Sequence, residues 1–95
     1  MEFDWSNPPF ELDGPLSTRE IEESFEDPFA VRLLPDSPRF AGQARFFNLG
    51  RAAGGAGVLS LYRTNGKTFR VIFARPFTPE EDFFHQRKVN QMLAQ

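Results

Sequence analysis

Two apolar segments, 58–63 (VLSLYR) and 68–74 (TFRVIFA), flank the residues 64–67, Thr-Asn-Gly-Lys. Asn-Gly fits the positive φ angles of a two-residue type I′ turn, so the sequence predicts a β-hairpin. The expected pairs on one face are Arg63 with Thr68, Leu61 with Arg70, and Leu59 with Ile72. The expected pairs on the other, helix-covered face are Tyr62 with Phe69, Ser60 with Val71, and Val58 with Phe73. Arg63 and Arg70 would then be diagonal neighbours on the more open face.

Two helices are expected, one on each side of the strand-rich part of the chain. Ser17 and Thr78 are each followed three residues later by a glutamate, which is the spacing of a capping box. The first helix is expected to end at Pro28, because proline cannot continue a helix. The second helix is expected to run to about Leu93.

Three further strands are expected, at 3–5, 29–34 and 44–49, with a loop at 6–16 and a turn at Pro35–Pro38. The order strand, helix, four strands, helix predicts an α+β domain. We expect a small antiparallel sheet of about four strands in a meander, packed with one N-terminal and one C-terminal helix. A chain of 95 residues supports one core, and its 12 phenylalanines can fill it, so we expect a single domain.

The composition excludes several classes of site. The chain has no cysteine, which excludes a disulfide scaffold, a thiol nucleophile and a cysteine-based zinc site. The Gly54-Gly55-Ala56-Gly57 stretch lacks the Lys and Ser/Thr of a phosphate-binding loop. No motif predicts a metal or a cofactor. No apolar run reaches the roughly 18 residues of a membrane span, and the acidic N-terminus does not resemble a signal peptide, so we expect a cytoplasmic protein without membrane contact.

Charge is unevenly distributed along the chain. Residues 1–31 contain nine acids and one base, residues 32–75 contain eight bases and one acid, and residues 76–95 contain three acids and two bases. Such segregation has two interpretations. Either the acidic helix and the basic strands neutralise each other within the fold, or they form two surfaces with different partners. If the second holds, Arg70 and Arg75 are candidates to bind an anion such as an RNA phosphate.

Several short motifs, read in order, resemble the BrnT family of ribonuclease toxins from bacterial toxin–antitoxin modules. The matching pieces are Phe3-Asp4-Trp5, Phe25-Glu26-Asp27-Pro28, Gly50-Arg51, the strand Arg70-Val71-Ile72-Phe73-Ala74-Arg75, and Glu81 in the following helix. They span roughly residues 3–87. The resemblance implies the RelE-like toxin fold and a metal-independent endoribonuclease in which the RNA 2′-hydroxyl is the nucleophile. It also implies a cognate antitoxin as partner, with a homo- or hetero-oligomer as the assembly.

The same resemblance assigns roles to individual residues. Arg70 and Arg75 would bind phosphate or stabilise the cleavage transition state. His85 stands where the family has a tyrosine and would serve as general acid or base. The residues expected to assist RNA binding are Arg51, Arg63 and Lys67.

The chain also departs from the family pattern. Leu12-Asp13-Gly14 replaces a Lys-His-Gly segment, and Phe73 replaces a serine. These departures leave open a catalytically degenerate toxin-fold protein that acts as a protein-interaction module. A third possibility is an interaction domain that uses its phenylalanines, since one of Phe46 and Phe47 and one of Phe83 and Phe84 could face outward.

Overall fold

The computed structural model describes residues 2–6, 16–33 and 45–94. The predicted turn at Pro35–Pro38, the segment Leu12-Asp13-Gly14 and most of the predicted loop at 6–16 lie outside the described residues.

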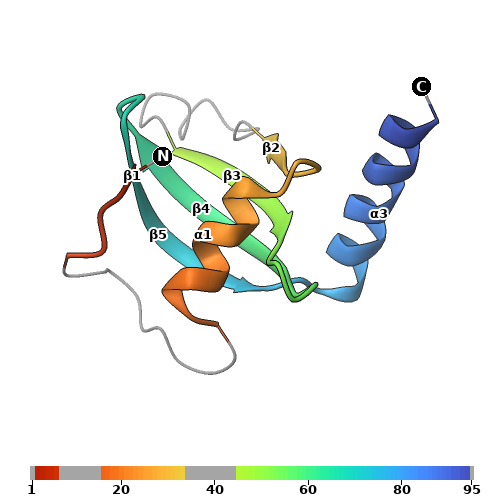
Figure 1. Cartoon of the computed structure of the whole chain (residues 1–95), viewed down its shortest axis with the longest axis horizontal. Coiled ribbons are helices and arrows are strands. Elements are labelled where there is room, and N and C mark those ends of the chain that lie inside the picture. Colours follow the sequence, from red (N-terminus) through yellow and green to blue (C-terminus); the bar gives the residue numbers. More distant parts are fainter. Residues whose placement is uncertain (1, 7–15, 34–44, 95) are drawn as a thin grey trace.

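The order of helices and strands is as predicted. In chain order the elements are β1 (Glu2–Phe3), α1 (Thr18–Glu26), β2 (Val31–Leu33), β3 (Arg45–Arg51), β4 (Gly57–Thr64), β5 (Thr68–Pro76) and α3 (Pro79–Leu93). The strands form one sheet in the order β1-β5-β4-β3-β2 (Figure 1). Strands β2 to β5 are the expected antiparallel meander, but β1 pairs with β5 in parallel. The α+β class is therefore confirmed, whereas the sheet is five-stranded and mixed rather than four-stranded and antiparallel.

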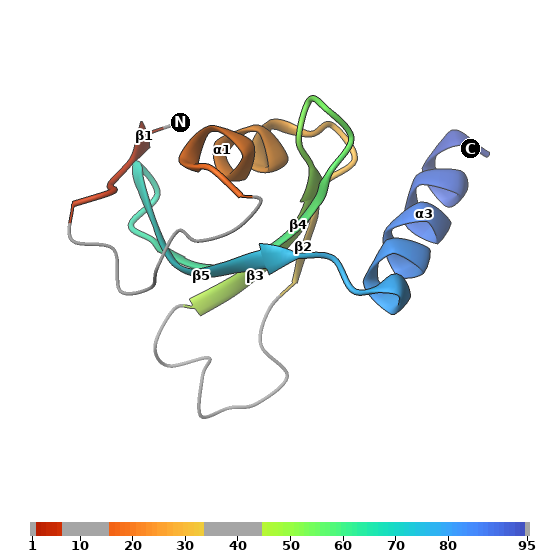
Figure 2. The same cartoon turned by 90° about the horizontal axis from the view of Figure 1, so that it is seen from below.

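Helix α1 covers one face of the sheet, as Figure 2 shows. It begins at the predicted capping box, where the Ser17 hydroxyl accepts the Glu20 N–H and the Glu20 carboxylate accepts the Ser17 N–H, each at 3.2 Å. Ile21 and Phe25 lie one turn apart and are both buried against the sheet. The other buried hydrophobic residues of this core are Leu16, Val58, Tyr62 and Val71. The core thus lies between α1 and the inner face of the meander.

The backbones of α1 and β3 approach each other closely at Gly50. A Cβ atom at this position would lie 1.9 Å from the carbonyl oxygen of Ser24. The same carbonyl accepts a hydrogen bond from Nδ2 of Asn48 at 3.3 Å, and Ser24, Asn48 and Gly50 are all buried. A residue without a side chain is therefore required where the helix crosses this strand.

The register of the β4–β5 hairpin differs from the predicted one. Thr64 pairs with Phe69, so the four residues 65–68 separate the paired positions instead of two. The Asn65 side chain explains the longer loop, because its Oδ1 accepts the backbone N–H groups of Lys67 and Thr68, each at 2.9 Å. The predicted type I′ turn is thus replaced by a loop that an asparagine side chain closes.

A β-bulge then changes which side chains of β5 share a face. Val71 pairs with Tyr62, and Phe73 pairs with Leu61, which leaves Ile72 as the extra residue. Strict alternation after Val71 would have placed Phe73 and Arg75 under α1. The observed outer-face pairs are Arg63 with Arg70, Leu61 with Phe73, and Leu59 with Arg75. The predicted pairs of Arg63 and Tyr62 are wrong because the longer loop shifts the register by two residues. The predicted pairs of Leu61, Ser60, Leu59 and Val58 are wrong because the bulge adds a third, and the bulge also moves Phe73 off the helix-covered face.

Helix α3 begins at its own capping box, formed by Thr78 and Glu81, and stands at one end of the sheet (Figures 1 and 2). Its N-terminal half contacts the body of the protein: His85 is buried and Phe84 is half-buried. Residues 90–94 are all exposed. Only the first half of α3 therefore packs against the rest of the fold, as predicted for the C-terminal helix.

Candidate functional site

The face of the sheet opposite α1, which we call the open face, carries three arginines side by side. Arg45 of β3 pairs with Arg63 of β4, and Arg63 pairs with Arg70 of β5, so the three side chains share this face. Cross-strand neighbours are about 5 Å apart at Cβ, where like charges destabilise a sheet. Within the described residues, Nε of Arg45 is buried without a hydrogen-bond partner, whereas Arg63 is exposed. We call these residues the arginine row.

Arg70 is anchored to the N-terminal segment. Its Nη1 donates to the Ser6 carbonyl at 2.9 Å and lies 3.4 Å from Oδ2 of Asp4. Hydrogen bonds from the hydroxyl and the backbone N–H of Ser6, more than the charge of Arg70, lower the pKa of Asp4. A carboxylate that is ionised at neutral pH therefore lies beside the arginine row.

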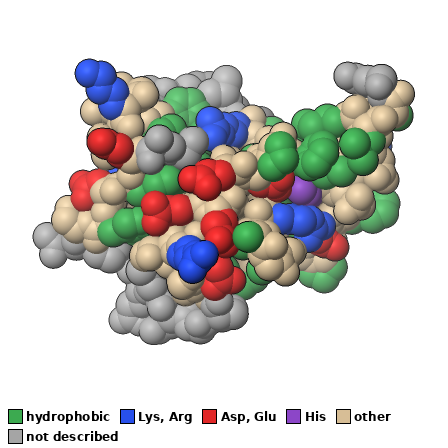
Figure 3. Space-filling model, in the orientation of Figure 1, with side chains coloured by type: hydrophobic (Ala, Val, Ile, Leu, Met, Phe, Trp, Pro, Cys, Tyr) green, Lys and Arg blue, Asp and Glu red, His purple; other side chains and the backbone are tan. Residues whose placement is uncertain are grey.

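The acidic helix does not supply the carboxylates that pair with the predicted site arginines. The α1 side of the molecule carries many acidic side chains, as Figure 3 shows, but the arginine row faces the opposite side of the sheet. In the described part of the chain, the ion-pair partners of Arg51, Arg70 and Arg75 are Asp82, Asp4 and Glu81. The acidic helix and the arginine row therefore present two separate surfaces.

A second row on the open face is apolar. It crosses four strands, from Leu33 through Phe47 and Leu61 to Phe73. Along β3 and β4 it lies two residues from the arginine row, or about 7 Å. Leu33 and Phe73 are 39% and 44% exposed, and Phe47 and Leu61 are half-buried. We call these four residues the apolar row.

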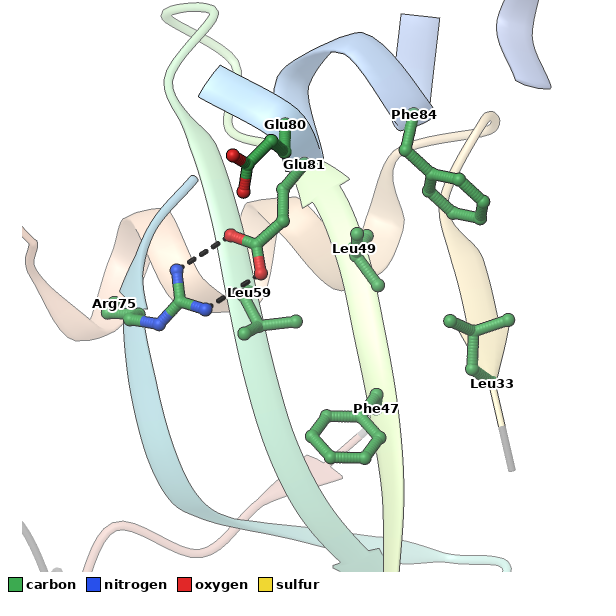
Figure 4. Close-up of a pocket in the computed structure, with 8 residues that line it drawn as sticks. All are labelled: Leu33, Phe47, Leu49, Leu59, Arg75, Glu80, Glu81 and Phe84. Carbon is green, nitrogen blue, oxygen red and sulfur yellow. Dashed lines mark hydrogen bonds and ion pairs between the residues drawn. The ribbon is translucent and has the colours of Figure 1, made fainter. Parts of the chain in front are cut away.

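The apolar row leads into a groove between the sheet and the start of α3 (Figure 4). The groove has a volume of about 450 Å³. Its lining residues are Leu33, Phe47, Leu49, Leu59, Arg75, Glu80, Glu81 and Phe84. Apolar side chains of the sheet and Phe84 of α3 form most of the surface, and Arg75 and Glu81 stand at one edge.

Arg75 is held by α3. Its Nη1 and Nη2 donate to the two carboxylate oxygens of Glu81 at 2.6 and 2.7 Å, and Glu81 also accepts the Thr78 N–H at 2.9 Å. The hydrogen bonds from Arg75 are the main reason that the pKa of Glu81 is lowered, and those to Glu81 raise the pKa of Arg75. Arg75 therefore fixes the N-terminus of α3 against β5 at the edge of the groove.

This pair predicts a pH-dependent contribution to stability. The folded protein depresses the pKa of Glu81 below its ordinary value of 4.5, so the pair stabilises the fold above about pH 4.5 and this contribution is lost on further acidification. Glu81→Gln keeps a side chain that can cap the helix but removes the charge. Because Arg75 is 36% exposed, we expect a loss of only about 1 kcal/mol at neutral pH, measured by urea unfolding, and this loss should shrink as the pH falls below 4.5 through the folded-state pKa of Glu81. Glu80→Gln is the matched control, and an equal loss for both variants would contradict the prediction.

His85 lies inside the protein rather than on the open face. It is 1% exposed, its Nε2 lies 3.5 Å from Oδ2 of Asp27, and its ring centroid lies 5.6 Å from that of Phe77. In this position the imidazole has no access to a bound RNA. His85 is therefore buried at the base of α3, and its role as general acid or base stays a prediction.

The remaining predicted residues are dispersed. Arg51 pairs with Asp82 and lies over the Phe77 ring at 5.7 Å, and Lys67 is exposed in the β4–β5 loop. The structure thus brings together Arg63 and Arg70 and adds Arg45, which the sequence analysis missed. The only indication in the sequence that Arg45 belongs to this site was its place in the predicted strand 44–49, two residues before Phe47.

Within the described residues, no group of His, Asp or Glu side chains could hold a metal ion, and no helix is long and apolar enough to cross a membrane. Comparison with family models, curated proteins and solved structures finds no match to this chain. The BrnT resemblance therefore stays a prediction.

Proposed function

We propose that this protein is a BrnT-like toxin with a RelE-like fold that binds RNA on the open face, cleaves it without a metal, and is neutralised by a cognate antitoxin. The observation that carries the proposal is the arginine row. Arg45 and Arg63 lie opposite each other on adjacent strands and repel one another, and a polyanion such as an RNA backbone relieves this repulsion. Phosphate is a good ligand for guanidinium because its oxygens match the paired N–H donors.

The proposed chemistry uses the RNA 2′-hydroxyl as nucleophile. Its oxygen bonds to the adjacent phosphorus, the bond to the 5′ oxygen breaks, and the products are a cyclic phosphate and a 5′-hydroxyl. Arg70 stabilises the negative charge that develops on the phosphoryl oxygens. Asp4, 3.4 Å from Arg70, holds this guanidinium in place, while water takes the proton of the 2′-hydroxyl and water protonates the leaving oxygen.

The test is incubation of the purified protein with messenger RNA in the presence of a chelator. We expect cleavage by the wild type and a loss of about 10²- to 10³-fold for Arg70→Gln, because a donor to the developing charge is removed.

Arg63→Gln should weaken RNA affinity and reduce the slope of log affinity against log salt by about 1. The same variant should fold as stably as the wild type or more stably, by up to about 1 kcal/mol, because a like-charge contact is lost.

The matched control is Arg19→Gln, since Arg19 belongs to α1 and its side chain is 88% exposed. It should leave cleavage and salt dependence unchanged. Equal cleavage patterns for the wild type and Arg70→Gln, or no cleavage by the wild type, would overturn the proposed activity.

A second candidate function is a catalytically inactive toxin-fold protein that serves as a protein-interaction module. The observation that favours it is the apolar surface of α3, where Phe83 and Leu93 are 67% and 68% exposed. Phe46 packs against the core, whereas Phe47 lies half-buried on the open face and Phe83 is exposed, and this placement supports an interface that uses phenylalanines. Growth arrest on expression of the protein alone would contradict this second function.

A further inference from the structure

We infer that α3 is a dimerisation surface, on which the α3 of a second copy of this chain packs antiparallel about a two-fold axis. This dimer does not depend on RNA binding or cleavage. Figure 1 shows α3 extending away from the sheet. The second half of α3 carries Met92 and Leu93, whose side chains are 44% and 68% exposed. A single chain therefore presents an apolar helix end to water.

Four side chains spaced four residues apart form a row along α3. The row consists of Glu80, Phe84, Lys88 and Met92, which are an acid, an aromatic ring, a base and an apolar side chain. Residues at this spacing lie on neighbouring turns along one side of a helix. The Lys88 ammonium lies 5.6 Å from the centroid of the Phe84 ring, in agreement with this placement. We call these four residues the α3 row.

The charges of the α3 row complement those of the same row in the reverse direction. If a two-fold axis passes beside Phe84, Glu80 of each copy lies opposite Lys88 of the other, because both are four residues from the axis. Glu80 is exposed and Lys88 is half-buried. Among the described residues, neither forms an ion pair within the chain. A second copy therefore supplies a counter-charge to both side chains, twice in each dimer.

The same arrangement brings Met92 to the apolar groove. Met92 lies about 12 Å along the helix from Phe84, whereas α3 begins only about 7 Å before Phe84, at Pro79. Met92 of one copy therefore passes beyond the start of the other copy's α3. The groove lies there, between the start of α3 and the sheet, and is lined by Leu49 and Leu59 (Figure 4). Burial of Met92 in this groove would remove apolar surface of both copies from water.

Charge complementarity identifies the occupant as a second copy. An unrelated apolar helix could cover Met92, but it would leave Glu80 and Lys88 without counter-charges unless it carried opposite charges at the same spacing. The chain itself carries the acid, the base, the apolar side chain and the groove, so a two-fold dimer satisfies all of them together. Because the surface is one helix and the groove beside it, we expect a dimer that dissociates on dilution.

The experiment measures the mass of the purified chain by analytical ultracentrifugation at a series of protein concentrations, without RNA. The mass should rise from 10.9 kDa towards twice that value as the concentration increases. Glu80→Lys and Lys88→Glu should each weaken association about tenfold or more, because each places like charges opposite each other twice in the dimer. A mixture of the two variants should associate as tightly as the wild type, because every charge pair between unlike copies is again of opposite sign.

Met92→Glu should also weaken association, because the dimer would bury a carboxylate in the apolar groove. The matched control is Phe83→Glu. Phe83 is 67% exposed but lies about 2.5 turns before Met92, on the opposite side of the helix, so this variant should associate like the wild type. Circular dichroism and thermal unfolding establish that each variant is folded. A wild-type chain that stays monomeric up to about 1 mM, or a mixture of the charge variants that associates no better than either alone, would overturn the dimer and leave the proposed RNA cleavage untouched.

Discussion

Gly50→Ala is expected to destabilise the protein by about 3 kcal/mol or more, and to leave little folded protein if the wild type is only marginally stable. The new Cβ would lie 1.9 Å from the Ser24 carbonyl oxygen, which belongs to the backbone of α1 and cannot rotate away. Relief requires α1 to move off the sheet. That movement would also break the hydrogen bond from Asn48 and open the core around Ile21 and Phe25. Urea or thermal unfolding followed by circular dichroism measures the loss.

The matched control for this substitution is Gly54→Ala in the β3–β4 loop. A Cβ at Gly54 has no atom within 4 Å in the described part of the structure, and its φ angle is not in the positive region. We expect the control to be neutral or slightly stabilising, because alanine restricts the unfolded chain. A Gly50→Ala variant as stable as the control would show that α1 does not approach β3 this closely.

Asp27→Ala is expected to cost about 3 kcal/mol of folding free energy and to loosen α3. Asp27 lies at the end of α1 and connects three segments. Its Oδ2 accepts the Arg51 backbone N–H at 2.8 Å and lies 3.5 Å from Nε2 of His85, and its Oδ1 accepts the Phe29 N–H at 2.9 Å. Without the carboxylate, the imidazole of His85 loses its acidic neighbour, and the two N–H groups lose their partner.

The measurements for this variant are the free energy of unfolding in urea and the hydrogen exchange of α3 amides. Exchange should accelerate in α3 more than in β4, because the lost contacts join α3 to the rest of the protein. Asp82→Asn is the matched control, since Asp82 pairs with Arg51 at the surface and its side chain is 56% exposed, so its loss should cost less than about 1 kcal/mol. Equal costs for the two variants would mean that Asp27 does not organise this junction.

Local signals in the sequence were sufficient to predict the elements. Ser17 with Glu20, and Thr78 with Glu81, are capping boxes in the structure as they are in the sequence, because the interaction depends only on residues three apart. The short strand at Phe3 is also present, as expected, although its parallel pairing with β5 was not predicted. No local sequence signature predicts whether two strands separated by a helix pair in parallel or antiparallel. The two strands of a hairpin, in contrast, are recognised from the turn between them and pair antiparallel.

The candidate site was harder to predict because it depends on pairing between distant segments. Asn65-Gly66 favours a two-residue turn, yet the Asn65 side chain competes for the backbone N–H groups and lengthens the loop. The position of Arg45 opposite Arg63 follows from the register of β3, which the sequence does not specify. The burial of His85 likewise depends on where α3 meets Asp27, a contact between residues 58 positions apart.

Ile72 is a residue whose loss the sheet could absorb. After deletion of that single codon, Phe73 would follow Val71 directly, and strict alternation would still turn Phe73 and Arg75 outward and Ala74 inward. The outer surface would keep its aromatic ring and its cation. Substitutions at Phe73 and Arg75, more than loss of the extra residue, are therefore the genetic route to a sheet with different binding chemistry.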